Sequence, residues 1–217
     1  MLMRQSGEEV EFLASAFIFH DAGYLLTVAH ATAPDEELIV ASPEHSAGES
    51  GGTAPFMPAT LEHVAPLPVS VVQYDADHDV ALLKFKVDLS LSAPNHVVGN
   101  PGGSRIGTTL MSLGFSFGHY RVHTPTVLQS VLSGKMQSTT GTNVVLFDRA
   151  IHAGDPGGPL VNVTDERVIG IVAGAFDPIE QRKEEHEKGV TVTTSLSYAT
   201  SIEYGDALLR REGVESR

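Results

Sequence analysis

The hydrophobic residues of the chain fall into short runs instead of long stretches. These runs are rich in Val, Ile, Leu, Phe and Thr, and clusters of Gly, Pro, Asn and Asp separate them. Runs of this length and composition between turn-forming residues are typical of β-strands. We therefore expect an all-β fold. The clearest runs are "SAFIFHDAGYLLTVAH", "EELIVASP", "VSVVQYDA", "VALLKFKV", "TLMSLGFSFG", "NVVLFDRAI" and "RVIGIVAGAF".

One segment near the end of the chain has the features of a helix. In "ATSIEYGDALLRREGV" the apolar residues include Ile202, Tyr204 and Leu208. Thr200 followed by Glu203 has the spacing of a capping box, and the glycine of the closing "EGV" is a typical helix stop. We expect a single C-terminal helix over about residues 200–212.

The segment "SAPNHVVGNPGGSRIG" is rich in Pro and Gly and divides the strands into two groups of similar size. Such a composition predicts a linker, here over about residues 95–106. We expect one domain over residues 1–217, with one barrel over about residues 10–94 and a second over about residues 107–198. Segments 42–58 and 177–189 are polar or charged and are expected to be loops in solvent.

Charge and composition exclude several classes of function. The chain has 14 Lys and Arg against 27 Asp and Glu, so its net charge is -13. Nucleic acid and anionic membranes repel such a chain on average. No apolar stretch approaches the roughly 18 residues of a membrane-spanning helix, and the start "MLMRQSGEEVEF" lacks the basic and apolar regions of a secretory signal. We expect no nucleic-acid or membrane partner and a cytoplasmic location. The absence of cysteine excludes disulfides and thiol chemistry.

Three segments occur in an informative order: "GYLLTVAHAT" (23–32), "DADHDVALLKF" (75–85) and "AIHAGDPGGPLVN" (150–162). In these segments the chain resembles the trypsin-like, chymotrypsin-fold serine proteases, and specifically their HtrA-like bacterial branch. The order His, Asp, Ser is that of chymotrypsin and differs from that of subtilisin and the α/β-hydrolases. The resemblance covers nearly all of residues 12–212. It implies two six-stranded antiparallel β-barrels followed by a C-terminal α-helix.

The resemblance assigns the general base to His30, which follows the apolar run "LLTVA". An imidazole titrates near neutral pH and can therefore exchange protons at the mouth between the barrels. The resemblance assigns the orienting acid to Asp79, whose carboxylate is expected to accept a hydrogen bond from the imidazole. Asp75 and Asp77 are alternative acids, but only Asp79 directly precedes the aliphatic run "VALL".

Pro156 occupies the position of the family's nucleophilic serine. Its side chain has no atom that attacks a carbonyl, so acyl-enzyme chemistry cannot start there. The family's oxyanion hole also uses the N–H of this residue, and proline has none, which leaves only the amide of Gly154. In a well-studied protease, losing the nucleophile lowers kcat by about 10⁶. Losing one oxyanion donor lowers it by about 10² to 10³. We expect the turn to persist, because the fixed φ of proline suits many tight turns.

Another hydroxyl is a possible replacement for the missing nucleophile. Such a residue would have to lie within hydrogen-bond reach of His30. Nothing in the local sequence favours any of the candidates, which are Ser133, Ser138, Thr139 and Thr140.

The resemblance also implies where a peptide side chain would bind. The floor of the primary specificity pocket comes from residues just before the turn and from the strand after it. No acid or base is among these residues, so a small or medium apolar side chain such as Val, Ala or Leu is the expected anchor. Asp155, next to the turn, is expected to bind local amides or solvent. The pocket residues are Ala150, Ile151, Val172, Ala173 and Gly174.

The histidines raise a metal hypothesis, because His30, His78 and His152 all approach the cleft if the family layout holds. His78 and Asp79 point to opposite faces if both lie on a strand, which weakens a shared site. The chain has no H-E-x-x-H spacing and no cysteine. We therefore expect no metal and no cofactor.

The leading hypothesis is a pseudoprotease that binds a peptide or a partner protein in the retained cleft, for example by strand addition. One alternative is an active serine endopeptidase whose sequence carries an inactivating change of serine to proline. A second alternative is a structural or metal-binding module. The sequence makes no prediction of the oligomeric state.

Overall fold

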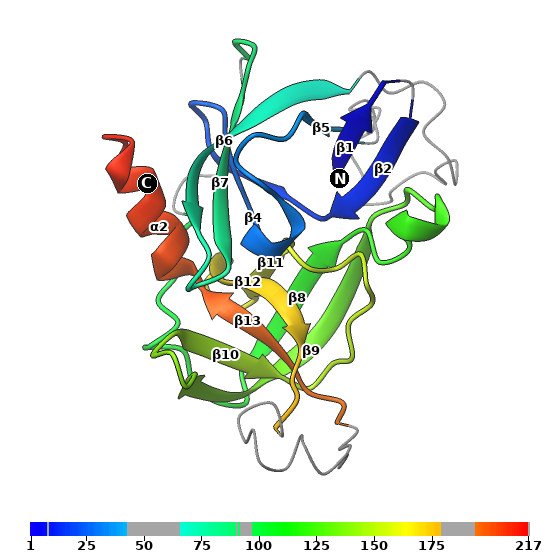
Figure 1. The fold of residues 1–217 in the computed structure, drawn as a ribbon. Coiled ribbons are helices and arrows are strands. Elements are labelled where there is room, and N and C mark those ends of the chain that lie inside the picture. The colour runs from blue at the N-terminus through cyan, green and yellow to red at the C-terminus, as the bar shows by residue number, and fades with distance from the viewer. Residues whose placement is uncertain (8, 43–65, 90, 92–96, 179–193, 217) are drawn as a thin grey trace, which may run out of the picture.

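The structure, a computed structural model, describes residues 1–7, 9–42, 66–89, 91, 97–178 and 194–216. Two β-sheets lie one above the other in Figure 1, and a helix packs beside the upper one. The expected all-β fold of two barrel-like units with a C-terminal helix is confirmed. Most of segments 42–58 and 177–189 lies outside the described residues.

The first sheet has seven strands in the order β2-β1-β5-β6-β7-β4-β3. Its outermost members, β2 and β3, follow each other in the chain with only two residues between them, so the open sheet curls back on itself. The strands are β1 (Leu2–Ser6), β2 (Glu9–Ala14), β3 (Phe17–His20), β4 (Tyr24–Thr27), β5 (Leu38–Val40), β6 (Leu67–Asp75) and β7 (Val80–Phe85).

This sheet differs in two ways from the sequence-based prediction. It has seven strands instead of six, because the chain is interrupted between β2 and β3, where the amide of Ser15 bonds to Pro156 and not to a neighbouring strand. It also begins at Leu2 instead of near residue 10. The sequence pattern missed β1 because the exposed half of the strand carries no hydrophobic residue.

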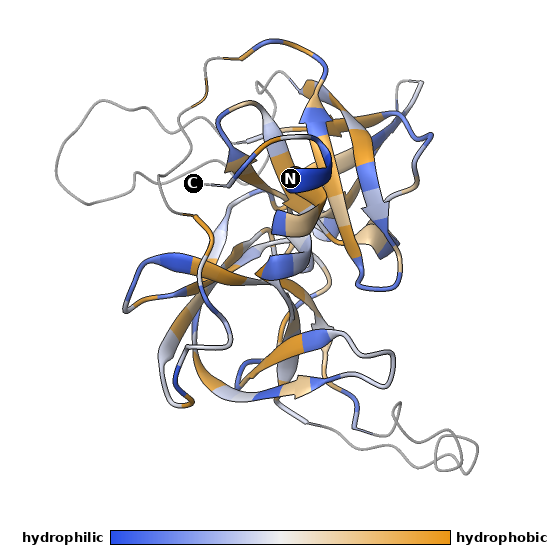
Figure 2. Cartoon of the chain, turned by 90° about the vertical axis from the view of Figure 1, so that its left-hand side faces the viewer, coloured by the Kyte–Doolittle hydropathy of each residue, from blue (hydrophilic) through white to orange (hydrophobic). Residues whose placement is uncertain are grey.

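The second sheet closes into a six-stranded barrel in the order β10-β13-β12-β11-β8-β9. All neighbouring strands in it are antiparallel. Hydrophobic stretches lie on the strands of both sheets, as the colouring of Figure 2 shows. The strands are β8 (Thr109–Gly114), β9 (Thr126–Gln137), β10 (Asn143–Phe147), β11 (Pro159–Asn162), β12 (Arg167–Ala175) and β13 (Ser197–Ser201).

The α-helix α2 (Ile202–Arg211) follows β13 and packs beside the first sheet (Figure 1). The expected capping box does not form: the N-cap is Ser201, without a side-chain bond, and Glu203 accepts a hydrogen bond from Asn143 instead. Gly213 has a φ of +74°, as expected of a helix stop.

A hydrophobic core joins the two sheets to the helix. It contains residues from β4 and β7 of the first sheet, from β12 of the second and from α2. Burial of this apolar surface is the main force that fixes the two units and the helix against each other. The candidate site residues described below therefore sit on a packed framework. Representative members of this core are Leu26, Leu82, Ile171, Leu208 and Leu209.

Candidate functional site

His30 lies at the end of β4. All four residues of β4 are buried, and Thr27 pairs with Ala81 of β7. The chain then leaves the sheet through one turn of 3-10 helix, η1 (Ala29–Ala31), in which Ala29 is buried and His30 is exposed. In Figure 1 this segment lies where the two sheets meet.

The structure brings His30 and Asp79 together. The Nδ1 atom of His30 lies 2.8 Å from Oδ2 and 3.0 Å from Oδ1 of Asp79. The backbone amide of His30 also donates to Oδ1 at 2.8 Å. Among the described residues, no partner is recorded for Nε2, the other ring nitrogen. A carboxylate at Nδ1 selects the tautomer and orientation that leave Nε2 available for proton exchange.

The electrostatics of the pair favour a protonated imidazole. The hydrogen bond that the imidazole donates to Asp79 raises the pKa of His30 above its ordinary value, against the opposing effect of partial burial. The His30 side chain is 55% exposed and that of Asp79 is 26% exposed. Water therefore screens the attraction in part.

Asp79 has an unusual backbone conformation, with a φ of +56°. Asp79 is the last residue of the turn between β6 and β7. The carboxylate of Asp75 closes this turn by accepting hydrogen bonds from the amide and the ring of His78. Burial alone raises the pKa of Asp75, but these hydrogen bonds and the charges of His78 and Arg211 outweigh it and hold the pKa low. Asp75, one of the alternative acids, is thus paired with His78 and not with His30.

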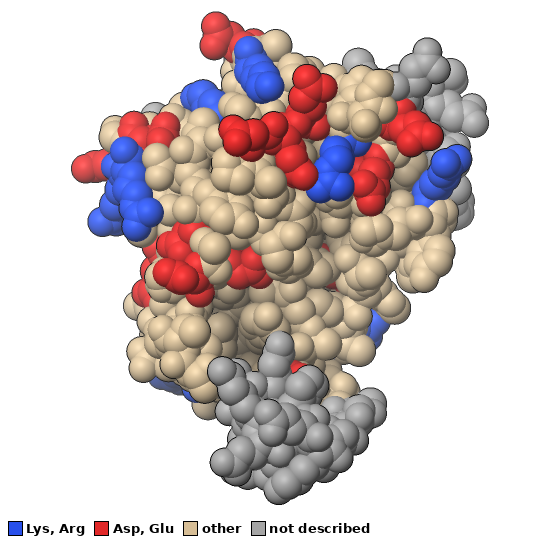
Figure 3. Space-filling model, viewed as in Figure 1, with Lys and Arg blue, Asp and Glu red and all other residues tan. Residues whose placement is uncertain are grey.

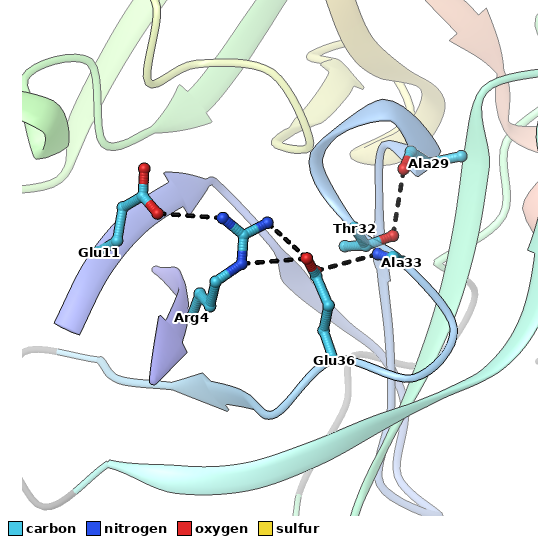
Figure 4. A network of polar contacts seen from close by, with 6 residues as sticks. All are labelled: Arg4, Glu11, Ala29, Thr32, Ala33 and Glu36. Atoms are coloured by element: carbon cyan, nitrogen blue, oxygen red, sulfur yellow. Dashed lines mark hydrogen bonds and ion pairs between the residues drawn. The ribbon is translucent and has the colours of Figure 1, made fainter. Parts of the chain in front are cut away.

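A second network fixes the chain after η1, as Figure 4 shows. The hydroxyl of Thr32 donates to the carbonyl of Ala29, and Glu36 accepts the amide of Ala33 at 3.0 Å. Arg4 of β1 donates to Glu36 and to Glu11 of β2. The segment that carries His30 is therefore held to the first sheet at both of its ends.

The turn that contains Pro156 is closed by Asp155. This buried carboxylate accepts hydrogen bonds from the amide of His152, at 2.7 Å, and from the hydroxyl of Ser116. The amide of Gly158 donates to the carbonyl of Asp155 at 3.1 Å. Asp155 therefore binds local groups, as the sequence suggested.

Ser15 joins this turn to the first sheet. Its amide donates to the carbonyl of Pro156 at 2.8 Å, and its hydroxyl donates to the carbonyl of Gly154 at 2.7 Å. Its own carbonyl accepts the hydroxyl of Thr27, three residues before His30. The sequence reasoning missed Ser15, although a serine between two alanines inside the apolar run "FLASAFIF" was a signal of a buried polar contact.

The amides of the turn differ in their availability. Gly157 donates to the carbonyl of Val172, and Asp155 donates to that of His152. Pro156 has no N–H. Among the described residues of the turn, this leaves the amides of Ala153 and Gly154 without a hydrogen-bond partner. A Cβ at Gly154 would lie 2.0 Å from the carbonyl oxygen of Phe115, so only glycine fits.

The five expected pocket residues have different environments. Ala150 is exposed, and Ile151 packs against the core of the closed barrel. The side chain of Val172 belongs to that core, and its backbone forms hydrogen bonds with Gly157 and Gly158. Val172 therefore supports the turn through its backbone, while its side chain is buried in the barrel. Ala173 belongs to the core between the sheets. Gly174 is half-buried.

The candidate replacement hydroxyls take part in local contacts. Ser133 donates to Val131 of its own strand, and Ser138 bonds to Thr140 within the β9–β10 turn. No contact recorded for the described residues joins either hydroxyl, or that of Thr139, to His30.

The three histidines of the metal hypothesis are not brought together. His30 pairs with Asp79 and His78 with Asp75, while the ring of His152 lies beside Phe117, 5.0 Å between centroids. Within the described ranges, no group of three or more potential ligand side chains is suited to hold a metal ion.

The surface charges are unevenly distributed. On the face shown in Figure 3, most charged side chains gather over the first sheet and the helix, while the middle of that face is largely uncharged. No helix in the described ranges is long and apolar enough to cross a membrane.

Comparison with known proteins relates this geometry to a family. The model of the trypsin-like peptidase domain matches residues 14–171. A probable periplasmic serine endoprotease, DegP-like, of Pseudomonas fulva (strain 12-X) is 29% identical over 171 residues, which are 77% of this chain and 30% of the relative. A protein of the same description from Pseudomonas putida (strain W619) is 30% identical with the same coverage. The chain thus spans about a third of the length of these relatives.

Solved structures show the same fold. The HtrA-type protease AlgW with a tripeptide has a TM-score of 0.66 at 23% identity, over 96% of this chain and 57% of that one. AlgW with a decapeptide has a TM-score of 0.62 at 24% identity, over 90% of this chain and 50% of that one.

The expectation of a cytoplasmic protein is wrong by this comparison, because the curated relatives are named as periplasmic. The inference had rested on the composition of the first residues, which does not report on the compartment of the family.

Proposed function

Because the chain belongs to the trypsin-like peptidase family, in its HtrA-like branch, we propose that it is a catalytically silent member that binds a peptide or partner protein in its cleft. One observation carries the proposal. The His30–Asp79 pair is formed, while residue 156 offers neither a hydroxyl nor an amide hydrogen.

The missing groups remove two separate contributions to catalysis. Without a hydroxyl at residue 156, the base at His30 has no proton to take from a nucleophile. Without its N–H, a developing oxyanion would meet the Gly154 amide alone. The hydrogen bonds from Ser15 to Pro156 and Gly154 are nonetheless formed. The turn therefore keeps its place against the first sheet without a nucleophilic side chain at residue 156.

A strand edge without a strand partner supports peptide binding. Gly174 and Ala175 of β12 pair with β13 on one side, whereas the pairing with β11 reaches only Ile171. In the described part of the chain, the other edge of residues 173–175 has no strand partner. Such an edge accepts an extended peptide through main-chain hydrogen bonds. Peptide binding in general is also supported by AlgW, which shares this fold and was solved with a tripeptide and with a decapeptide.

The surroundings of this edge favour an apolar peptide. Ala150, Ile151 and Gly174 carry no charge, which matches an anchor side chain such as Val, Ala or Leu. The names of the curated relatives support a periplasmic site of action.

Binding is tested with fluorescently labelled, unfolded casein and measured by anisotropy. We expect saturable binding by the unaltered protein. Gly174→Val adds a branched side chain next to the free edge, with its Cβ 3.1 Å from the ring of Tyr198, and should weaken binding at least tenfold. Gly102→Val is the control, because it adds the same side chain in an exposed turn away from the cleft. Equal affinity of both variants would contradict binding at this edge.

Catalytic silence is tested with the same substrate. We expect no cleavage by the unaltered protein. Cleavage at a rate abolished by His30→Ala would overturn the proposal.

A second candidate function is an endopeptidase that lost only its serine. The intact His30–Asp79 pair favours it. Pro156→Ser restores both the hydroxyl and the N–H, whereas Pro156→Ala restores the N–H alone and serves as the control. Proteolysis by Pro156→Ser but not by Pro156→Ala would support this candidate. Silence of both variants would show that other parts of the site have changed as well.

A further inference from the structure

The turn that carries Asp79 contacts the C-terminal helix outside the cleft. The ring of His78 stacks on that of Tyr204 of α2, with 3.9 Å between centroids and 17° between planes. The hydroxyl of Tyr204 accepts a hydrogen bond of 2.8 Å from the amide of Asn143, so the phenolic oxygen of the tyrosine is also fixed. Asp75 binds Nδ1 of His78 at 2.8 Å, which fixes the rotation of the imidazole.

This contact matters because Asp79 has a costly conformation. A φ of +56° lies in the left-handed region, where a residue with a Cβ is strained. Such a residue persists only where its surroundings hold it. Three contacts hold this turn: the carboxylate of Asp75, the stack of His78 on Tyr204, and the hydroxyl of Thr142, which donates to the carbonyl of Asp77.

The same helix also supports the strand that leads to His30. Gly205, next to Tyr204, packs so closely on Leu26 of β4 that a Cβ there would lie 2.5 Å from the leucine Cδ1. β4 ends at Thr27, and His30 follows in η1. One turn of α2 therefore contacts both elements that carry the His30–Asp79 pair.

We propose that Tyr204, acting through the stacked ring of His78, is a positioning residue that holds the turn of Asp79 and thereby keeps the His30–Asp79 hydrogen bond formed. Neither residue touches the cleft or a reacting atom. The inference concerns the geometry of the pair and holds whether the protein binds peptides or cleaves them, so it does not rest on the proposed function.

The test is an NMR titration of the His30 ring in the folded protein, together with the signal of its Nδ1 proton. The hydrogen bond that His30 donates to Asp79 raises the pKa of His30, so a loosened Asp79 lets that pKa fall towards about 6.5. We expect this fall, and a broadened Nδ1 proton signal, in Tyr204→Leu and in His78→Ala. Tyr204→Phe keeps the stacked ring and should retain the pKa of the unaltered protein.

A merely structural role would lower the melting temperature without moving the pKa of His30. Tyr120→Leu is the matched control, because Tyr120 is 77% exposed on the 3-10 helix η2 (Gly118–Tyr120). If Tyr204→Leu does not fold, the proposal is tested with His78→Ala alone. The His78 side chain is 31% exposed, so its removal leaves no large cavity. An unchanged pKa of His30 in folded His78→Ala would overturn the proposal.

Discussion

The amide of Ser15 donates a hydrogen bond of 2.8 Å to the carbonyl of Pro156, although 141 positions separate the two residues in the chain. The Ser15 hydroxyl donates to Gly154 and accepts the amide of Phe115 at 2.9 Å. A single buried serine thus ties the turn of the closed barrel to the first sheet, next to the strand that leads to His30.

Removing this hydroxyl should destabilise the protein. Ser15→Ala leaves the amide of Phe115 and the carbonyl of Gly154 without their partner in a buried place, which costs about 1–3 kcal/mol. We expect a loss of this size in the free energy of unfolding, measured with urea. Ser133→Ala is the control, because that exposed hydroxyl bonds only within its own strand. It should change stability by less than about 0.5 kcal/mol. Equal losses in both variants would contradict the structural role of Ser15.

Gly157 is expected to tolerate no side chain. Its φ is +88°, and a Cβ would lie 2.0 Å from the carbonyl oxygen of Ser15. Gly141 has a φ of +87° but no atom within 4 Å of such a Cβ. Gly141→Ala therefore measures the cost of the backbone conformation alone, about 1 kcal/mol. Gly157→Ala should lose clearly more in urea unfolding. Similar losses of unfolding free energy in Gly157→Ala and Gly141→Ala would show that the chain at Ser15 moves away from the added Cβ at no measurable cost.

Asp79 should control the pKa of His30. In Asp79→Asn the negative charge is gone, so we expect the pKa of His30 to fall, as measured by NMR titration. Asp77→Asn removes a neighbouring charge whose carboxylate has no recorded bond to the ring, and it should leave the pKa close to that of the unaltered protein. A larger fall of the His30 pKa in Asp77→Asn than in Asp79→Asn would show that Asp77 and not Asp79 is the partner of His30.

The pair should also make stability depend on pH. The pKa of His30 is higher in the folded than in the unfolded protein, so its protonated form stabilises the fold. This contribution is fully present below about pH 6.5, the ordinary pKa of histidine, and it is lost as the pH rises through the higher folded value. The difference in unfolding free energy between the unaltered protein and His30→Gln should therefore shrink from acid to alkaline pH. A difference that grows with pH would contradict the assignment.

Several features of the fold were predictable because they depend on local sequence. Short apolar runs between turn-forming residues indicated strands, and helical spacing after Thr200 indicated α2. The strand β1 was missed because its outer half carries no hydrophobic residue, and the capping box failed because Glu203 binds Asn143 across the surface. β1 forms nonetheless because it pairs with β5, more than 30 residues further along the chain, so in both cases a distant contact outweighed the local pattern.

The sequence by itself determined that residue 156 is proline and therefore has neither a nucleophile nor an amide hydrogen, since both facts follow from covalent structure. Only the tertiary structure decided that Asp79 and not Asp75 binds His30, that Ser15 holds the turn, and that Tyr204 reaches the turn of Asp79 through His78. These contacts join residues from separate strands and a helix. Their geometry arises from the packing of two sheets and α2 around a common core, which no short stretch of sequence specifies.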